Sequence, residues 1–378
     1  MKRFGSTSGE NYHLRVKREY ELEYEQPSGA SEGLRPGEGD VTRVSGLESG
    51  TDVRAGLAAL YAPVATDIRR AEEIFDEEID GDLPFINELC DTVRSYRGKM
   101  LRPALLLLSA RACGKLTSAH HTLAAVVEMV HMATLVHDDV LDEADERRRR
   151  PTVNNIAGNE AAVLLGDYLI SHAFHLCSSL DSQFASRRIG ATTNTVCEGE
   201  LLQNHYRGVL DLTEQQYTTI VERKTAALTA TSCELGAFFA DSSTEVVAAL
   251  HHYGRSVGIA FQIVDDILDI AGDQSIVGKT LGRDAALGKV TLPVLHCLAN
   301  ADAETAATLR TILEGQQALN GNADQFRSCL DRTGSIEAAV QQAEAYVSSA
   351  ISSLDCLPDS DARQSLRTMA SFITERRF

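Results

Sequence analysis

The chain has 378 residues, of which 43% are hydrophobic and 24% are charged, a composition that is ordinary for a globular protein with a substantial core. Its formal net charge of −18 argues against a nucleic-acid partner, because a phosphate backbone favours a basic protein surface. The eight cysteines lack C-x-x-C spacing, which indicates reduced thiols and a cytoplasmic location, and no apolar run reaches the roughly 18–20 residues of a membrane span, so any membrane contact is expected to be peripheral.

Residues 1–52 are rich in Gly, Ser, Glu and Arg and show little periodicity. This composition predicts a disordered or loosely attached extension, without the apolar segment of a signal peptide and without a predicted role. From residue 53 onward, apolar residues recur at helical spacing, first at Leu57, Leu60, Tyr61, Val64 and Ile68. Further helices are predicted over residues 101–113, 117–144, 157–181, 186–208, 213–240, 244–271, 287–299 and 336–354. Residues 53–378 are therefore predicted to form one all-α domain, a bundle of long, mostly antiparallel helices around a central cavity.

Two short acidic repeats lie within apolar stretches of this pattern. The first acidic box is Asp138-Asp139-Val140-Leu141-Asp142, and the second acidic box is Asp265-Asp266-Ile267-Leu268-Asp269. Carboxylates one turn apart on an exposed helix repel each other by roughly 0.2–0.5 kcal/mol per pair, and by more where water is excluded. Such an arrangement needs a counter-charge, and hard divalent cations bound by oxygen, together with diphosphate, can supply it.

The helical phase of both boxes supports this interpretation. On a helix, His131, Asp138 and Asp142 fall within about 20° of one line. The second box belongs to a stripe made of Gln262, Asp265, Asp266, Asp269 and Asp273. Because the remaining positions there are apolar, that helix is predicted to be buried, with its acidic stripe facing a cavity. A solvated acidic face is the alternative, although such faces usually include lysine or glutamate.

Several basic residues have positions suited to binding diphosphate. Lys99 and Arg102 lie at the start of a predicted apolar helix, where the backbone amides also favour anions. Arg147 and Arg148 follow the first box. Lys224-Thr225, Lys279 and Lys289 come later in the chain. Taken singly, each of these cations is more simply interpreted as a surface charge.

Taken together and in this order, the segments resemble the trans-isoprenyl diphosphate (polyprenyl) synthases over about residues 55–378. The matching segments are Gly98-Lys99-x-x-Arg102-Pro103, His137-Asp138-Asp139-x-x-Asp142 with Arg147-Arg148, Gly166-Asp167-Tyr168-Leu169, Lys224-Thr225, Phe261-Gln262-x-x-Asp265-Asp266-x-x-Asp269, and Gly278-Lys279 with Gly288-Lys289. The resemblance implies an isoprenoid-synthase fold, a homodimer, and head-to-tail condensation of isopentenyl diphosphate with an allylic diphosphate.

The resemblance also implies roles for individual residues. Three Mg²⁺ ions, with Mn²⁺ as a substitute, would be held by Asp138, Asp139, Asp142, Asp265 and Asp269. The diphosphate of isopentenyl diphosphate would be bound by Lys99, Arg102, His131 and Arg148, and the allylic diphosphate by Arg147, Lys224, Lys279 and Lys289. The expected catalytic residues are Lys224, Thr225, Gln262 and Lys279. Of these, Thr225 and Gln262 would lie beside the developing allylic cation, where their dipoles stabilise positive charge.

One position departs from the family pattern. Members of the family usually have Arg-Arg-Gly where this chain has Arg147-Arg148-Arg149. Losing the glycine removes easy access to positive φ. The arginine pair is still expected to function, but the assignment of each arginine to one diphosphate stays open.

The residues just before the first box bear on product length. In the family, bulky aromatic side chains four or five residues before the first aspartate close the product tunnel. Here those positions are Thr134 and Ala133, with Val130 one turn deeper. None of the three is aromatic, which predicts a long product of the kind used for quinone side chains. The alternative is a shorter product, limited by a plug from another helix, for which Phe174 and Phe184 are candidates.

Three other functions are weighed against prenyl elongation. A class I terpene cyclase shares the fold and the first box, but it usually has a different second metal motif and needs no isopentenyl diphosphate site. An HD-type phosphohydrolase would use His137-Asp138, but it has no use for the second box. A non-catalytic subunit of a heteromeric synthase commonly lacks the acidic boxes, and both are intact here.

Overall fold

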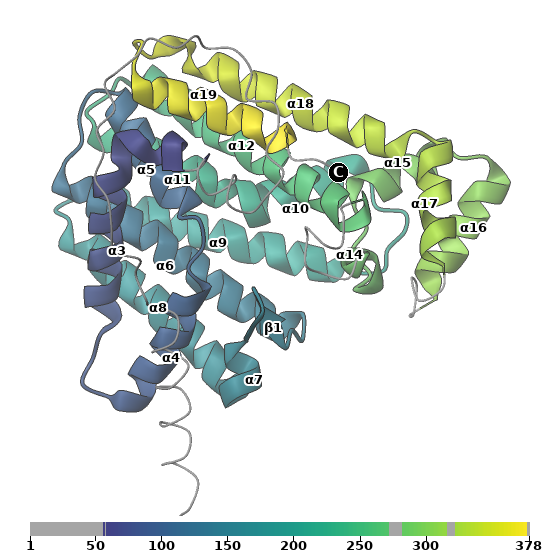
Figure 1. Ribbon diagram of the computed structural model, residues 1–378, viewed down its shortest axis with the longest axis horizontal. Coiled ribbons are helices and arrows are strands. Elements are labelled where there is room, and N and C mark those ends of the chain that lie inside the picture. Colours follow the sequence, from purple (N-terminus) through teal and green to yellow (C-terminus); the bar gives the residue numbers. More distant parts are fainter. Residues whose placement is uncertain (1–55, 57, 272–281, 316–321, 376–378) are drawn as a thin grey trace, which may run out of the picture. The chain divides into compact units, whose positions relative to one another are not determined.

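The computed structural model describes residues 56, 58–271, 282–315 and 322–375. All of these residues lie in one compact unit that spans residues 50–378. The predicted boundary at residues 52 and 53 stays a prediction. The α-helices are α3 (Ala65–Ile79), α4 (Pro84–Tyr96), α5 (Leu101–Ala112), α6 (Ser118–Leu141), α7 (Val153–Ala157), α8 (Asn159–Ser179), α9 (Gln183–His205), α10 (Glu214–Val221), α11 (Ala227–Phe239), α12 (Thr244–Ala271), α14 (Arg283–Ala286), α15 (Leu292–Asn300), α16 (Ala303–Glu314), α17 (Ala323–Arg332), α18 (Ser335–Ser353) and α19 (Asp361–Thr374). The predicted all-α fold is confirmed (Figure 1).

Short segments of other types complete the described chain. The 3₁₀-helices are η1 (Ala62–Val64) and η3 (Leu354–Cys356), and η2 (Glu222–Ala226) is a π-helix. Among the described residues, the strands are β1 (Glu146–Arg147) and β2 (Arg150–Pro151), which form one antiparallel hairpin.

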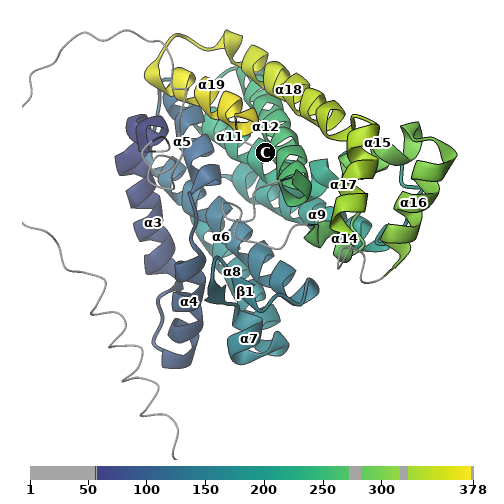
Figure 2. The same ribbon diagram turned by 45° about the vertical axis from the view of Figure 1, so that its right-hand side comes forward.

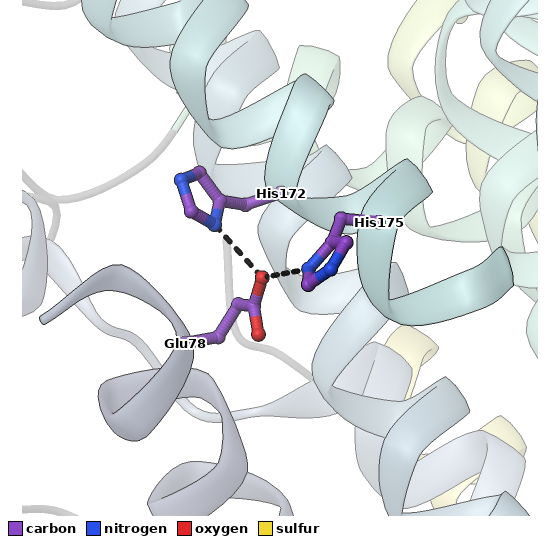
Figure 3. A group of neighbouring side chains, drawn as sticks. All are labelled: Glu78, His172 and His175. Carbon is purple, nitrogen blue, oxygen red and sulfur yellow. Dashed lines mark hydrogen bonds and ion pairs between the residues drawn. The ribbon is translucent and has the colours of Figure 1, made fainter. Parts of the chain in front are cut away.

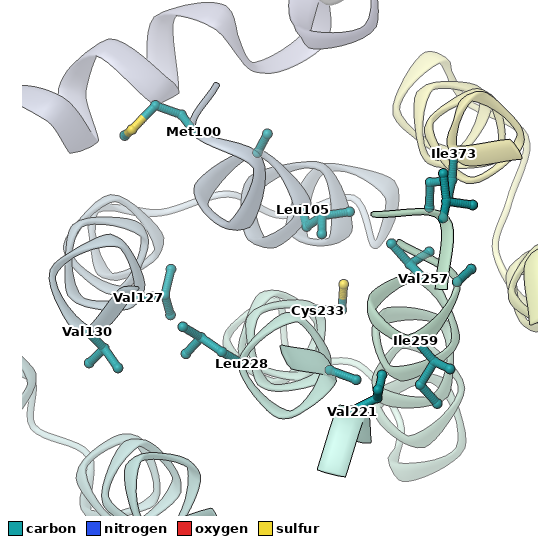
Figure 4. Close-up of a cluster of buried hydrophobic side chains, with 14 of the residues drawn as sticks. Met100, Leu105, Val127, Val130, Val221, Leu228, Cys233, Val257, Ile259 and Ile373 are labelled. Atoms are coloured by element: carbon teal, nitrogen blue, oxygen red, sulfur yellow. The ribbon is translucent and has the colours of Figure 1, made fainter. Parts of the chain in front are cut away.

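Helix α6 lies at the centre of the packing. It contacts α8, α3, α5 and α11, while α12 packs between α11 and α18 (Figures 1 and 2). In the core, Val127 of α6 points toward Leu228 of α11, and Cys233 of α11 lies between α5 and α12 (Figure 4). Fully buried aliphatic side chains of this kind each stabilise the fold by about 1.5–3 kcal/mol. The ends of α6 and α12 that carry the acidic boxes are thus fixed by a continuous apolar core.

The structure divides one predicted helix into three parts. The prediction over residues 213–240 corresponds to α10, η2 and α11. In a π-helix each turn holds an extra residue, and such segments occur frequently at functional sites. Lys224 and Thr225 lie within η2. Periodicity did not reveal this change, because apolar residues continue on both sides of it.

The first predicted helix is also interrupted. Residues 58–61 are helical, but Pro63 lies in η1, and the regular helix α3 starts only at Ala65. Proline at the start of a helical segment is compatible with helix but removes a backbone donor. Helices α4, α7, α14, α16, α17 and α19 were not predicted.

Two further observations concern membrane-spanning helices and the cysteines. Within the described ranges, no helix has the length and apolar character required to cross a membrane. The eight cysteines all belong to these ranges, and each is a free thiol.

The turn of the β1–β2 hairpin holds the residue that departs from the family pattern. Arg148 and Arg149 connect the strands with φ of 53° and 64°. Two consecutive positive φ values match the right-handed twist of a two-residue hairpin and are normally supplied by Asn-Gly or Gly-Gly. For a residue with a side chain, the left-handed conformation costs roughly 1–2 kcal/mol. Arg149 therefore adopts positive φ although it is not a glycine, at a cost in backbone strain.

Replacing Arg149 with glycine should raise the free energy of unfolding by about 1 kcal/mol, because it relieves this strain more than it loosens the unfolded chain. Denaturant unfolding of the two proteins measures the difference. Arg150→Gly is the matched control, since Arg150 is also exposed but lies in β2. The control should lower stability by about 0.5–1 kcal/mol. A stability gain in both variants would contradict the explanation.

Candidate active site

The first acidic box ends helix α6. Asp138 and Asp139 lie in the last turn and Asp142 is the C-cap residue, where the helix dipole disfavours negative charge. Two of the carboxylates contact cations from distant segments. Asp142 lies 2.9 Å from Lys289 Nζ and 3.4 Å from Arg207 Nη2. Asp138 Oδ2 lies 3.8 Å from Lys224 Nζ. The box therefore gathers basic groups from the turn after α9, from η2 and from the segment between α14 and α15.

Asp139 differs from the other two carboxylates of the first box. Its side chain is 3% exposed, and both of its oxygens lie 3.0 Å from Arg147 Nε. Burial raises the pKa of Asp139, and the Arg147 guanidinium opposes that shift. Asp139 therefore points toward Arg147, and this ion pair holds the arginine side chain in position.

Burial and charge crowding act strongly on Asp138. Burial raises the pKa of Asp138 to about 6, repulsion from Glu200 and Asp142 adds to the shift, and Lys224 opposes it. Burial alone would lower the pKa of Lys224, but attraction to Asp138 and Glu200 more than offsets this and raises it. Lys224 also forms an ion pair with Glu200 and donates a hydrogen bond to Gln203 Oε1 at 2.8 Å. Lys224 therefore lies near two carboxylates, those of Asp138 and Glu200, and its single charge cannot neutralise both.

The second acidic box lies in the last turns of α12, and its three carboxylates have different surroundings. Asp265 is exposed, whereas Asp266 is buried. Asp266 accepts hydrogen bonds from Tyr217 Oη at 2.6 Å and from Gln262 Nε2 at 2.8 Å. Burial raises the pKa of Asp266 well above its ordinary value, and Asp284 adds to the shift. The carboxylates of the acidic stripe therefore differ in burial, and the prediction that the stripe faces a cavity stays a prediction.

Asp269 accepts hydrogen bonds from the backbone at the start of α14. The amides of Arg283 and Asp284 donate to its carboxylate at 3.3 and 3.0 Å, and the Gly282 amide donates to its carbonyl oxygen at 2.7 Å. The second box thereby holds α14 in place. Asp273 and Lys279 lie outside the described residues.

A chain of side-chain contacts links the two boxes. Lys224 of η2 approaches Asp138 on α6. The next residue, Thr225, donates from its hydroxyl to Gln262 Oε1 at 2.9 Å. Gln262 is one turn before Asp266 on α12. The π-helical turn places Lys224 and Thr225 so that one reaches α6 and the other reaches α12.

Gly199 of α9 allows this turn to approach closely. A Cβ atom at Gly199 would overlap the backbone of Arg223 and Lys224. Because backbone atoms rather than a flexible side chain occupy that space, α9 and η2 pack at a distance that only glycine permits.

Asp284 on α14 is a site residue that the sequence analysis missed. Burial raises its pKa to about 6, and repulsion from Asp269, Asp265 and Asp142 contributes, while Lys289 opposes the shift. The charge of Asp284 therefore interacts with carboxylates of both boxes, which shows that the two boxes border the same region. Its sequence context, Gly282-Arg283-Asp284, carries no repeat that could have identified it.

A second group of basic residues surrounds His131 on α6. Burial lowers the pKa of His131 well below its ordinary value, and the nearby Arg102, Arg147 and Arg148 lower it further. Arg148 donates to the Tyr96 carbonyl at 2.7 Å, and its guanidinium covers Gly98. Of the residues predicted for isopentenyl diphosphate, the structure thus brings Arg102, His131 and Arg148 together. Lys99 is exposed at the start of α5.

Glu128, which the sequence analysis did not single out, offsets part of this positive charge. It lies one turn before His131 on α6 and is 2% exposed. Burial raises the pKa of Glu128, and Arg102, Arg97 and Arg148 lower it. Among the described residues, the buried Arg102 Nε finds no hydrogen-bond partner. Arg97 is paired with Asp76 at 2.6 Å, so Glu128 mainly faces the guanidinium groups of Arg102 and Arg148, and the donor that Arg102 leaves unpaired suits an anion.

The three residues predicted to control chain length fall into two groups. Thr134 is partly exposed, as are His131, Leu135, Asp138 and Asp142, and these positions share one face of α6. Ala133 and Val130 are 0% and 1% exposed. Phe184, one of the alternative plugs, stacks on Phe238 at 3.8 Å between ring centroids.

The raised pKa values predict that the metal-free protein becomes less stable as the pH rises. Asp138 and Asp284 have folded-state pKa values of about 6, against an ordinary value of 3.8. Between these values the folded chain binds more protons than the unfolded chain, so the free energy of unfolding decreases with increasing pH. In the presence of a chelator, we expect a loss on the order of 1–3 kcal/mol between pH 5 and pH 7.

Urea unfolding at several pH values measures this loss. Asp138→Asn should make the pH dependence shallower, because the substituted side chain does not titrate. A variant with an unchanged pH dependence would contradict the role of Asp138.

Comparisons with known proteins agree with this geometry. Residues 83–331 match the family model described as polyprenyl synthetase. Octaprenyl diphosphate synthase of Escherichia coli K12 is 36% identical over 315 residues, covering 82% of this chain and 96% of the relative. A short chain isoprenyl diphosphate synthase of Methanothermobacter thermautotrophicus is 34% identical over 319 residues, covering 82% of this chain and 97% of the relative.

A solved structure also matches the fold. The crystal structure of a decaprenyl diphosphate synthase from Rhodobacter capsulatus superposes with a TM-score of 0.81 at 34% identity, covering 85% of this chain and 99% of that one. The matched region includes both acidic boxes and the segments between them. On the family match and the near-complete coverage of these relatives, the chain belongs to the polyprenyl synthetase family.

Proposed function

We propose that this protein condenses isopentenyl diphosphate head-to-tail with an allylic diphosphate and releases a long-chain trans-polyprenyl diphosphate and diphosphate. The observation that carries the proposal is that the two acidic boxes border one region, next to two separate groups of basic residues. Burial and the carboxylates of both boxes raise the pKa of Asp284. Arg102, His131 and Arg148 form one group, and Lys224 and Lys289 contact the first box. Two anion sites flanking an acidic region fit a reaction between two diphosphates.

The donor set fits a hard divalent cation. The family is generally dependent on divalent metal, and we propose Mg²⁺, three ions in all, held by Asp138, Asp142, Asp265 and, with reorientation, Asp269. The raised pKa values of Asp138 and Asp284 are those of carboxylates that lack sufficient positive charge. Oxygen ligands without sulfur or imidazole suit Mg²⁺. When bound, the cations would stabilise the negative charge that develops on the departing diphosphate.

The group around His131 is proposed to bind isopentenyl diphosphate. The unpartnered Arg102 Nε supplies a ready donor, and Arg148 is held in place by the Tyr96 carbonyl. The lowered pKa of His131 leaves its imidazole neutral near pH 7, so it can donate one N–H without adding charge. These residues orient the nucleophilic double bond, which lowers the entropic cost of the reaction.

Residues of η2 and α12 are proposed to act at the allylic partner. Lys224 and Lys289 each lie within 4 Å of an aspartate of the first box and would bind the leaving diphosphate together with Arg147. The Thr225 hydroxyl donates its proton to Gln262 Oε1, so its lone pairs are available to a developing carbocation. Fixed dipoles of this kind stabilise charge without reorganisation. Lys279, also proposed for the allylic site, lies outside the described residues.

Details of the fold weigh against the other functions. His137 faces α8, where its Nε2 lies 3.1 Å from the Val163 carbonyl and its ring fills the space over Gly166. An HD-type phosphohydrolase would need His137 and Asp138 at one metal ion. A cyclase would not need the cationic group around His131, and a non-catalytic subunit would not need both boxes.

The direct test is incubation of the purified chain with farnesyl diphosphate, isopentenyl diphosphate and Mg²⁺, followed by chromatography of the dephosphorylated products. We expect long-chain polyprenols that are absent when a chelator is added. Cyclised hydrocarbons, or phosphate release without chain growth, would overturn the proposal. Activity only after addition of a second protein would identify a heteromeric enzyme.

We also propose a homodimer in the cytoplasm. Large apolar side chains are exposed along α8 and α9, among them Val163 (42%), Leu164 (68%) and Leu201 (70%). Covering such side chains with a second copy would stabilise the assembly. The free cysteines fit a reducing compartment.

Leu164→Glu should convert the dimer to monomers, because it introduces a charge into the proposed apolar interface. Size-exclusion chromatography with light scattering measures the mass. Leu83→Glu is the control, since Leu83 is 56% exposed but precedes α4. A dimer that survives Leu164→Glu, or a wild-type monomer, would contradict this interface.

A further inference from the structure

Two histidines and one glutamate meet on the surface between α3 and α8, outside the proposed active site. Glu78 lies in the last turn of α3, and His172 and His175 lie three residues apart on α8. Residues at this spacing project from the same face of a helix. The Nδ1 atoms of both imidazoles lie 2.8 Å from the same oxygen, Oε1 of Glu78 (Figure 3).

We propose that Glu78, His172 and His175 form a binding site for a zinc-class divalent transition metal ion. One ligand atom from each residue lies within 4.8 Å of the other two. Bond lengths of about 2.0–2.2 Å to zinc place tetrahedral ligand atoms roughly 3.3 Å apart. The observed separation of 2.8 Å between each nitrogen and the shared oxygen must therefore widen by roughly half an ångström when the metal enters.

The surroundings of the three side chains fit this adjustment. The Glu78 side chain is 14% exposed and that of His172 is 26% exposed, whereas His175 is 74% exposed and its ring can shift toward solvent. Tyr168 packs on the His172 ring with 4.2 Å between centroids, which fixes the less exposed of the two histidines. The open side next to His175 leaves a fourth position for water.

The ligand chemistry separates this site from the acidic boxes. Imidazole nitrogen is preferred by Zn²⁺, Ni²⁺ and Cu²⁺, while Mg²⁺ prefers oxygen ligands. The metal would join the end of α3 to the middle of α8. These two helices carry none of the residues proposed for catalysis, so the site is expected to act on stability and not on the chemical step.

The test measures Zn²⁺ binding by the full chain. The protein is stripped with a chelator, desalted and kept in excess Mg²⁺, and Zn²⁺ is titrated against a chromophoric competitor. We expect one high-affinity equivalent. His175→Ala should weaken the affinity by about tenfold or more, and His172→Ala combined with His175→Ala should abolish this equivalent. Zn²⁺ should also raise the midpoint of thermal unfolding of the wild type but not of the double variant.

The controls address folding and adventitious binding. His252→Ala removes an exposed histidine on α12 that bonds to Ser349, and it should leave the affinity unchanged. Glu78→Gln keeps the shape of the side chain and should still weaken binding. X-ray absorption at the zinc edge should report nitrogen and oxygen ligands without sulfur, which separates this site from the exposed Cys197 and Cys356.

Two results would overturn the proposal: equal zinc affinity in the wild type and the double variant, or the absence of saturable binding by the wild type. Prenyl transfer in the presence of Mg²⁺ should be the same in the wild type and in His175→Ala. The zinc site and the proposed enzymatic function can therefore fail independently.

Discussion

Replacing Asp138 with alanine should reduce the turnover of prenyl transfer by about a thousandfold or more, which corresponds to roughly 4 kcal/mol of transition-state stabilisation. Asp138 is partly buried at the end of α6, with Lys224 as its nearest cation at 3.8 Å. In the proposed function this carboxylate would hold a divalent cation that binds the diphosphate, and alanine would remove that ligand. Steady-state kinetics with both substrates measures the loss, and Asp265→Ala should cause a loss of the same order.

The stability of the same variant provides an independent check. Because burial raises the pKa of Asp138, its ionised form destabilises the metal-free fold at pH 7. Asp138→Ala should therefore leave the free energy of unfolding unchanged or higher while activity is lost. Asp145→Ala is the control, since this exposed aspartate follows the first box closely, and its activity should stay normal. Near-normal activity of a folded Asp138→Ala protein would disprove the metal assignment.

Replacing Ala133 with tyrosine should shorten the main product. Ala133 is fully buried about one and a half turns before Asp138, so a growing chain that passes this level must separate the side chains around it. A phenol ring would occupy that space and stop elongation earlier. The substitution should also destabilise the protein by about 1–3 kcal/mol, because it overpacks the core. Chromatography of the products formed from farnesyl diphosphate measures the length distribution.

Two companion variants make the result specific. Ala133→Ser is the control and should keep the wild-type product, because it adds little volume. Thr134→Phe introduces an aromatic ring on the partly exposed face of α6 that also carries Asp138, and it should shorten the product with less loss of stability. If the folded and active Ala133→Tyr protein makes products of unchanged length, the chain grows along another path.

The sequence allowed prediction of the fold class and of many residues that the structure brings together. Apolar periodicity identified α6 and α12 because both are long and regular, and the acidic repeats marked the helix ends that border the candidate site. The basic residues near His131 could be grouped only through resemblance, since Arg102 and Arg148 lie far apart along the chain. Their proximity arises from packing of α5, α6 and the β1–β2 hairpin.

Other parts of the site depend on contacts that leave no pattern in the sequence. Asp284 and Glu128 became apparent only from their burial and their charged neighbours. The π-helix η2 interrupts a continuous apolar stretch, so periodicity alone merged it with the adjoining helices. Asp139 was predicted as a metal ligand like its neighbours, yet the structure turns it toward Arg147, a choice that depends on how the hairpin folds back.

The hydrogen bonds of Asp269 connect the proposed metal site to the start of α14. The Asp269 carboxylate, which we propose as a metal ligand, also accepts hydrogen bonds from the backbone amides of Arg283 and Asp284. A cation bound to the Asp269 oxygens would weaken the hydrogen bonds that these two amides donate to them. We therefore expect metal binding at the proposed site to fray the first turn of α14, and the exchange rates of these two amide protons would report on it without any catalytic assay.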